Sequence, residues 1–299
     1  MSAEQLEVII KDVQACFGAW TAHTPLQQMR DDWDNVFAKV PCTIGAKCEP
    51  VDAGGVPAVK ISASNAKPDR AILYFHGGGY SFGSPRSHRD LGEFLSQAAE
   101  AHVFMLDYRL APENPFPAAV EDATAAYRWL LKSGFKPGNI ALSGDSAGGG
   151  LTLCALLSIR DNDLPLPACA VPLSPWVDLE CTGGTMDTKA DVDPMVGRDF
   201  TRQLAELYIP SGDLRHPLAS PMYGNLKGLP PLLVQVGERE TLLDDAVRIT
   251  DLARAAGVDV TLEVEPEQIH VFQIFATRLD EGAAAIARIG TFIKKHTSR

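Results

Sequence analysis

Apolar runs of strand length alternate with longer helix-forming stretches along most of this chain. Largely apolar runs of strand length lie at 70–75, 103–107, 139–143, 169–173 and 232–236, and a further strand is expected at 260–264. Stretches rich in helix formers follow them, at 87–99, 118–131, 151–160, 242–256 and 283–294. Repeated pairs of a strand and a helix predict a mostly parallel sheet with helices on both faces.

A β-hairpin is expected before the first of these runs. Two strand-like segments, 44–51 and 56–62, flank the sequence Asp-Ala-Gly-Gly at 52–55, which is a turn signal. With this hairpin the predicted sheet has eight strands.

The alternation of strand and helix stops between about 174 and 230. This stretch contains helical pieces such as 200–209 and many Pro, Gly and Asp residues, but no clear strand. A loop of this length is unusual inside a compact domain unless it is functional. We therefore expect an inserted helical cap at 174–230, within an α/β core formed by 41–173 and 231–299.

Residues 1–40 are predicted to be helical. Apolar side chains recur there at helical spacing, at Leu6, Ile9, Ile10, Val13, Phe17 and Trp20. A second short helix is indicated by Trp33, Val36, Phe37 and Val40. An apolar stripe of this kind usually packs into a core, and it could also form half of a lid over an active site.

Composition and charge narrow the class of partner. The 299 residues suffice for one large α/β domain with an insertion, or for two small domains. A hydrophobic content of 45% indicates a sizeable core rather than disorder. Acidic residues outnumber basic ones by 38 to 27, for a net charge of -11. Nucleic acids and anionic membrane surfaces need clustered Lys and Arg, so we expect neither as a partner.

The sequence predicts a cytoplasmic protein. Its first residues lack the basic start and apolar core of a signal peptide, and no apolar run approaches the length of a membrane span. The six cysteines include no Cys-x-x-Cys pair, so we interpret them as reduced thiols. Cys42 and Cys48 are the pair closest in sequence, and we do not expect them to be bridged.

A Gly-x-Ser-x-Gly motif at 144–148 offers a candidate nucleophile. It lies between the strand at 139–143 and the helix at 151–160, the context in which a serine occupies a strained turn with its hydroxyl exposed. Gly144 and Gly148 leave room for the neighbouring chain to pass closely. The following helix directs free backbone N–H groups toward whatever Ser146 attacks.

The sequence His-Gly-Gly-Gly at 76–79 follows the buried strand 70–75. Attack on an ester builds negative charge on the carbonyl oxygen, and this charge needs donors already in place. Three glycines let the backbone bend so that its N–H groups face the serine. We expect the N–H groups of Gly77 and Gly78, with that of Ala147, to form an oxyanion hole.

Ser146 needs a base and an acid, which in α/β hydrolases follow in the order Ser, acid, His. His270 follows the strand 260–264 after a short loop, whereas His296 lies in the polar tail, so we assign His270 as the base. The acid should follow the strand 232–236. Glu240 precedes the helix there and is our first choice, with Asp244 next; Glu238 and Asp245 are further candidates.

Other chemistries lack a signature in this sequence. There is no Walker loop, no Gly-x-Gly-x-x-Gly with a suitably spaced acid, and no His/Cys cluster with metal-ligand spacing. We therefore expect no cofactor and no metal.

The motifs at 76–79, 107–113 (Asp-Tyr-Arg-Leu-Ala-Pro-Glu) and 144–149 (Gly-Asp-Ser-Ala-Gly-Gly) together resemble those of the bacterial hormone-sensitive-lipase-like esterases of the α/β-hydrolase fold. The resemblance covers roughly residues 40–299. It implies a carboxylesterase for short acyl esters, with a helical cap built from residues 1–40 and 174–230. The family's usual acid is an aspartate before proline, whereas Glu240-Thr241 stands here, as in some relatives.

Alternatives to a short-chain esterase remain at this point. A lactonase, an amidase or a deacetylase would use the same groups, because the machinery treats any activated carbonyl alike. A ligand receptor on a hydrolase scaffold is disfavoured, because related plant receptors have lost the histidine that His270 supplies here. Family members often dimerise through an edge strand, which here would be the one at 260–264.

Overall fold

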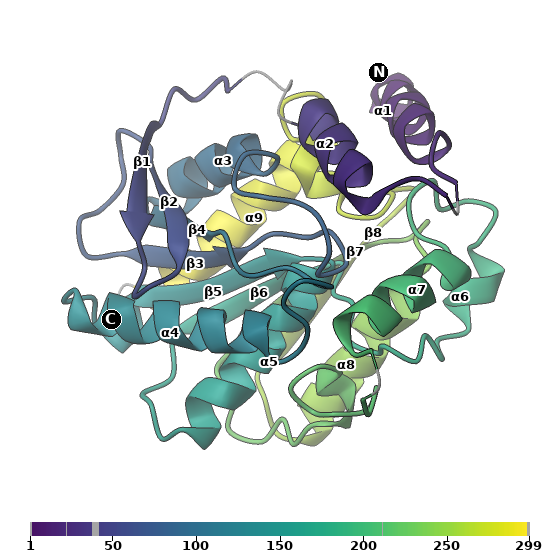
Figure 1. Ribbon diagram of the computed structural model, residues 1–299. Coiled ribbons are helices and arrows are strands. Elements are labelled where there is room, and N and C mark those ends of the chain that lie inside the picture. Colours follow the sequence, from purple (N-terminus) through teal and green to yellow (C-terminus); the bar gives the residue numbers. More distant parts are fainter. Residues whose placement is uncertain (1, 22, 38–41, 211, 298–299) are drawn as a thin grey trace.

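One eight-stranded sheet runs through the computed structural model, which describes residues 2–21, 23–37, 42–210 and 212–297 (Figure 1). The strands are β1 (Lys47–Asp52), β2 (Pro57–Ser62), β3 (Ala71–Phe75), β4 (His102–Leu106), β5 (Ile140–Asp145), β6 (Cys169–Leu173), β7 (Leu232–Gly237) and β8 (Val260–Glu265). Their order across the sheet is β1-β2-β4-β3-β5-β6-β7-β8.

The sheet is mostly parallel. The pairs β1–β2 and β2–β4 are antiparallel, and every other neighbouring pair is parallel. The hairpin at the N-terminal edge aligns Lys47 with Ser62 and Asp52 with Pro57. Its turn holds Gly54 and Gly55 at φ 81° and 94°, which glycine adopts without the steric cost of a side chain. The predicted eight-stranded, mostly parallel sheet and its hairpin are confirmed.

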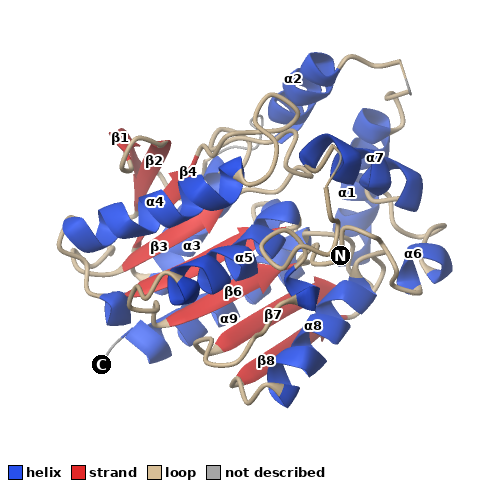
Figure 2. Ribbon diagram, turned by 60° about the horizontal axis from the view of Figure 1, so that its bottom comes forward, coloured by secondary structure: helices blue, strands red, loops and turns tan. Residues whose placement is uncertain are grey.

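Helices cover both faces of the sheet (Figures 1 and 2). One face carries α3 (Arg89–Ala99) and α9 (Asp280–Thr297), which pack against each other. The other face carries α4 (Ala118–Lys132), α5 (Ala147–Asp161) and α8 (Leu243–Ala255). Because the central strands are covered on both sides, every residue of β3, β5, β6 and β7 is buried.

A third group of helices lies beyond the carboxyl ends of the parallel strands (Figure 2). It consists of α1 (Ser2–Phe17), α2 (Leu26–Phe37), α6 (Thr185–Thr188) and α7 (Arg198–Tyr208). The rings of Trp20, after α1, and Phe200, on α7, lie 6.1 Å apart, so the two distant segments meet here. Between residues 174 and 230, outside the undescribed residue 211, there is no strand, as predicted.

Several helix boundaries differ from the expectation by a few residues, and two of the differences have a clear physical reason. Helix α2 begins at Leu26, seven residues before Trp33, because a largely polar first half carries little apolar signal. Helix α9 begins at Asp280 rather than at 283, and Asp280 and Glu281 complement the positive end of the helix dipole. Val40 and the expected boundary between 40 and 41 lie outside the described residues. Among the described residues, no helix is long and apolar enough to cross a bilayer.

Candidate active site

Ser146 lies in the sharp turn between β5 and α5. Its backbone has φ 54° and ψ −120°, a conformation that residues with a side chain rarely adopt. The two flanking glycines have no room for a side chain. A Cβ on Gly144 would overlap the carbonyl oxygen of Gly148, and one on Gly148 would overlap that of Phe75. The predicted strained turn with closely passing backbone is confirmed.

His270 and Glu240 form a buried pair beside this turn. Glu240 follows β7 and His270 follows β8, so the parallel strands bring both to the edge of the sheet where Ser146 lies. His270 Nδ1–H donates to Glu240 Oε2 over 2.8 Å. Burial lowers the pKa of His270, but nearby carboxylates, Glu240 foremost, together outweigh burial and hold that pKa above its usual value.

The other acidic candidates have different partners. Asp244 Oδ2 accepts the N–H of Thr185 over 3.0 Å, so its carboxylate faces α6. Asp245 is buried and accepts the N–H of Val177 over 2.9 Å; burial raises its pKa to about 7. Of the acids considered after β7, Glu240 is therefore the one in contact with His270.

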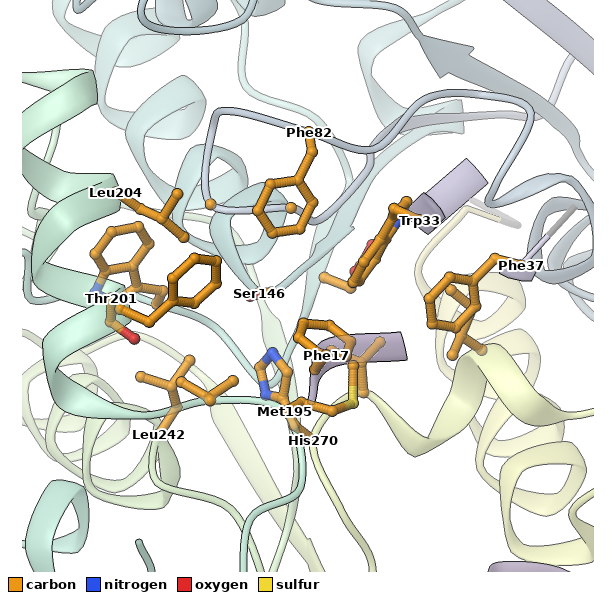
Figure 3. A pocket seen from close by; sticks show the side chains of 18 residues that line it. Phe17, Trp33, Phe37, Phe82, Ser146, Met195, Thr201, Leu204, Leu242 and His270 are labelled. Carbon is orange, nitrogen blue, oxygen red and sulfur yellow. The ribbon is translucent and has the colours of Figure 1, made fainter. Parts of the chain in front are cut away.

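Ser146 and His270 line one cavity (Figure 3). The hydrogen bonds of the described chain do not include one between Ser146 Oγ and the free nitrogen of His270. Catalytic hydrogen bonds are often long in a free enzyme and shorten when substrate binds. The shared cavity places the hydroxyl and the imidazole where one reacting group can contact both.

The glycines at 77–79 differ in their surroundings. The N–H of Gly77 donates to Asp145 Oδ1 over 3.0 Å, so it is not free to bind an oxyanion. Gly78 and Gly79 line the cavity at φ 115° and 58°, and no acceptor within the described chain contacts their N–H groups. Of the expected donor pair, Gly77 is therefore wrong, because its N–H is already bound, whereas the oxyanion-hole role of Gly78 stays a prediction. Ala147 begins α5, so its N–H has no partner within the helix.

Asp145 joins the serine turn to the glycine loop, a role that the sequence did not reveal. Besides Gly77, it accepts the hydroxyl of Tyr74 over 2.8 Å and Nε2–H of His88 over 3.3 Å. Burial raises the pKa of Asp145, but His88 and these donors outweigh it and bring that pKa below its usual value. Asp145 was visible only as the variable position of the motif, and no pattern marked His88.

The cavity wall is largely aromatic and aliphatic (Figure 3). It combines residues of α1 and α2, the loop after the glycines, the loop after β6 and the segment around α7, namely Phe17, Trp33, Phe37, Phe82, Trp176, Met195, Phe200 and Leu204. Ser146, His270 and Asp145 are among the few polar groups that reach it. Such a wall suits a neutral apolar group next to the serine.

No group of three or more His, Cys, Asp or Glu residues that could hold a metal occurs in the described part of the chain. The expectation that the reaction needs neither metal nor cofactor stays a prediction.

Comparisons with known proteins agree with this geometry. An acetyl-hydrolase of Streptomyces hygroscopicus is 50% identical over 228 residues, 76% of each protein. An esterase of Acinetobacter venetianus is 32% identical over 280 residues, 91% of this chain and 92% of the relative. A crystal structure of an esterase from the bacterial hormone-sensitive lipase family matches with a TM-score of 0.96 at 47% identity, covering 98% of both chains.

A family model described as the alpha/beta hydrolase fold matches residues 72–274, which include the glycine loop, Ser146, Glu240 and His270. These similarities confirm the resemblance inferred from the motifs. The chain therefore belongs to the bacterial hormone-sensitive lipase family of the α/β-hydrolase fold, and it is a carboxylic ester hydrolase.

Proposed function

We propose that Ser146 is the nucleophile of this esterase, with His270 as its base and Glu240 as the acid that orients His270. The observation that carries the proposal is the buried 2.8 Å hydrogen bond between His270 Nδ1 and Glu240 Oε2, beside a strained serine in the same cavity. With Nδ1–H committed to Glu240, the other ring nitrogen, Nε2, is the one available to take a proton from Ser146.

In the proposed reaction, His270 takes the proton of Ser146 as the serine oxygen attacks the ester carbonyl. The N–H groups of Gly78, Gly79 and Ala147 stabilise the oxyanion. His270 then protonates the leaving alcohol, and an acyl-enzyme remains on Ser146. Water, deprotonated by His270, releases the acid and restores the serine.

We propose a neutral ester with a short acyl chain as the substrate. The aromatic wall close to Ser146 supports a small apolar acyl group, and the similarity to a protein named acetyl-hydrolase supports acetyl esters. Lactones and amides need the same groups, and a comparison of turnover on ester, lactone and amide substrates separates these activities.

A fluorophosphonate probe tests the assignment of the nucleophile. We expect one covalent adduct, which mass mapping places on Ser146, because an activated serine attacks the phosphorus and retains it. Ser146→Ala should lose both the adduct and the hydrolysis of p-nitrophenyl acetate, and His270→Ala should slow labelling by at least about 10³-fold. Labelling of folded protein at another residue, or a Ser146→Ala variant with wild-type turnover, would refute the assignment.

We propose further that residues 1–40 and 174–230 together form the cap over this site. Supporting this, α1 and α2 contribute Phe17, Trp33 and Phe37 to the cavity wall, and α7 contributes Phe200 and Leu204.

A cytoplasmic location and a dimer through an edge strand are also proposals. β8 lies at the edge of the sheet, with Val264 40% exposed, and light scattering of the purified chain tests the dimer.

A further inference from the structure

Asp193 is a carboxylate outside the proposed triad that binds two different parts of the protein at once. It lies before α7, in the segment between β6 and β7. Its Oδ1 accepts the N–H groups of Met195 and Val196 over 2.9 and 3.0 Å. Its Oδ2 accepts the N–H and the hydroxyl of Thr241 over 2.8 and 3.1 Å. One side chain thus satisfies four donors, two on each oxygen.

Both parts of the protein that Asp193 binds belong to the candidate active site. Met195 and Val196 line the cavity that holds Ser146. Thr241 directly follows Glu240 in the chain and is fully buried. Its hydroxyl also lies 3.3 Å from the carbonyl oxygen of Val196. The wall of the cavity and the loop that carries Glu240 therefore share one anchor.

The charge of Asp193 also acts on the histidine. Three carboxylates raise the pKa of His270 against the effect of burial, namely Glu240 first, then Asp193 and Asp145. Burial raises the pKa of Glu240 above its usual value. The contact with His270 lowers that pKa, and the negative charge of Asp193 raises it. Asp193 is thus a second negative charge close enough to influence the pair, although it does not touch His270.

We propose that Asp193 is a positioning residue: it fixes the loop of Glu240 against the cavity wall, and its charge helps Glu240 to stabilise protonated His270. The proposal rests on the triad proposed above. A loop displacement of about 1 Å can cost a factor of about 100 in rate, so an anchor one residue from the acid affects turnover directly. Asp193 then links the cap segment to the reaction without contacting substrate.

The role requires a carboxylate. An amide has one acceptor oxygen, so Asp193→Asn can satisfy the donors at Met195 and Val196 or those at Thr241, but not both pairs. It also removes the charge. A neutral histidine is the active base, so the rate is lost as the pH falls through the pKa of His270. Removing a nearby negative charge lowers that pKa, and the acid limb of the profile moves to lower pH.

The experiment compares Asp193→Asn with Asp191→Asn, measuring kcat and KM for p-nitrophenyl acetate from pH 5 to 9. Asp191 is exposed, two residues away, and its substitution changes the net charge equally. For Asp193→Asn we expect kcat to fall about 10-fold, with a smaller change in KM, and the acid limb to move about 0.3–1 pH unit lower. Asp191→Asn should match the wild type. A folded Asp193→Asn variant whose kcat and profile match those of Asp191→Asn would overturn the proposal.

A second pair of variants tests the contact between Asp193 and Thr241 without removing charge. This pair tests the positioning role even if Asp193→Asn does not fold. Thr241→Val removes the hydroxyl that Asp193 accepts and keeps the N–H, whereas Thr241→Ser keeps both. We expect Thr241→Val to lower kcat about 3–10-fold with an unmoved acid limb, and Thr241→Ser to restore it. Wild-type turnover in Thr241→Val would refute the anchor. Failure of the triad itself would appear separately, as activity retained in Ser146→Ala.

Discussion

At the scale of single residues, Ser146 stores strain where the chemistry is proposed to occur. Its φ of 54° brings the Cβ close to its own backbone, and residues with a side chain pay of order 1–3 kcal/mol for such conformations. The surrounding turn leaves no alternative, because Gly144 and Gly148 are packed directly against backbone carbonyls. The serine is held in place by its neighbours and not by its own preference.

Two variants at this position separate strain from chemistry. Ser146→Ala and Ser146→Gly both lose the hydroxyl and should be inactive, but only glycine relieves the strained backbone. We expect Ser146→Gly to unfold with a free energy about 1 kcal/mol higher than that of Ser146→Ala, measured by chemical denaturation. Equal or lower stability of the glycine variant would show that the turn holds no such strain.

At the scale of elements, Arg30 attaches α2 to two loops of the core. Arg30 Nε donates to the carbonyl oxygen of Ser81 over 2.8 Å, and its Nη1 and Nη2 bind the carboxylate of Glu113 over 2.8 and 2.7 Å. Nη2 also donates to the carbonyl oxygen of Ala111 over 3.0 Å. The helix that supplies Trp33 to the cavity is thus attached to the loop that follows the glycines.

A lysine at position 30 cannot reproduce these contacts, because its single ammonium group lacks the planar fork of a guanidinium. We expect Arg30→Lys to lower the melting temperature by a few degrees and to raise KM for p-nitrophenyl butyrate about 3–10-fold, with a smaller change in kcat. The exposed Arg86, substituted in the same way, is the control. Unchanged KM and stability in Arg30→Lys would mean that the other contacts of α2, among them the hydrogen bond from the Ser84 hydroxyl to Asp34, hold the helix without the guanidinium.

The elements most accurately predicted from the sequence are those whose signal is local. Ser146, His270 and Glu240 follow strands that apolar runs reveal, and parallel strands must bring them to one edge. Which two glycines have free N–H groups cannot be predicted from the local sequence. It depends on the distant Asp145, which accepts the N–H of Gly77. Arg30 meets Glu113 across 83 residues and Asp193 meets Thr241 across 48, and no periodicity in one sequence encodes such contacts.

At the scale of the whole molecule, the proposed chemistry and the cavity wall come from different parts of the chain. Ser146, Glu240 and His270 lie at strand ends of the sheet, whereas much of the wall comes from α1, α2 and α7. Leu204 of α7 lies directly over the glycine loop, since a Cβ on Gly79 would overlap its side chain. The length of acyl chain that fits should therefore depend on the wall.

Shortening the side chain of Leu204 tests whether the cavity wall, and not the reacting residues, sets the length of the acyl chain. We expect Leu204→Ala to raise the ratio of kcat/KM for p-nitrophenyl octanoate to that for the acetate about 10-fold, because it opens space beside Ser146. The phosphonate should still label Ser146. Leu214→Ala removes a partly buried leucine of the same inserted segment away from the cavity and should leave the ratio unchanged. An unchanged ratio in Leu204→Ala would show that the acyl chain leaves the cavity by another side.

The aromatic wall assembled from sequence-distant helices has a consequence for how this protein can diverge. A change in α1, α2 or α7 alters which molecule is accepted while Ser146, His270 and Glu240 keep their geometry, because these three residues follow strands β5, β8 and β7 and not the helices that form the wall. New selectivity can therefore accumulate by single steps in these helices, each leaving a working enzyme. Substitutions at Arg30 and Asp193 should be tolerated least, because they change the shape of the cavity wall and the reactivity of the site together.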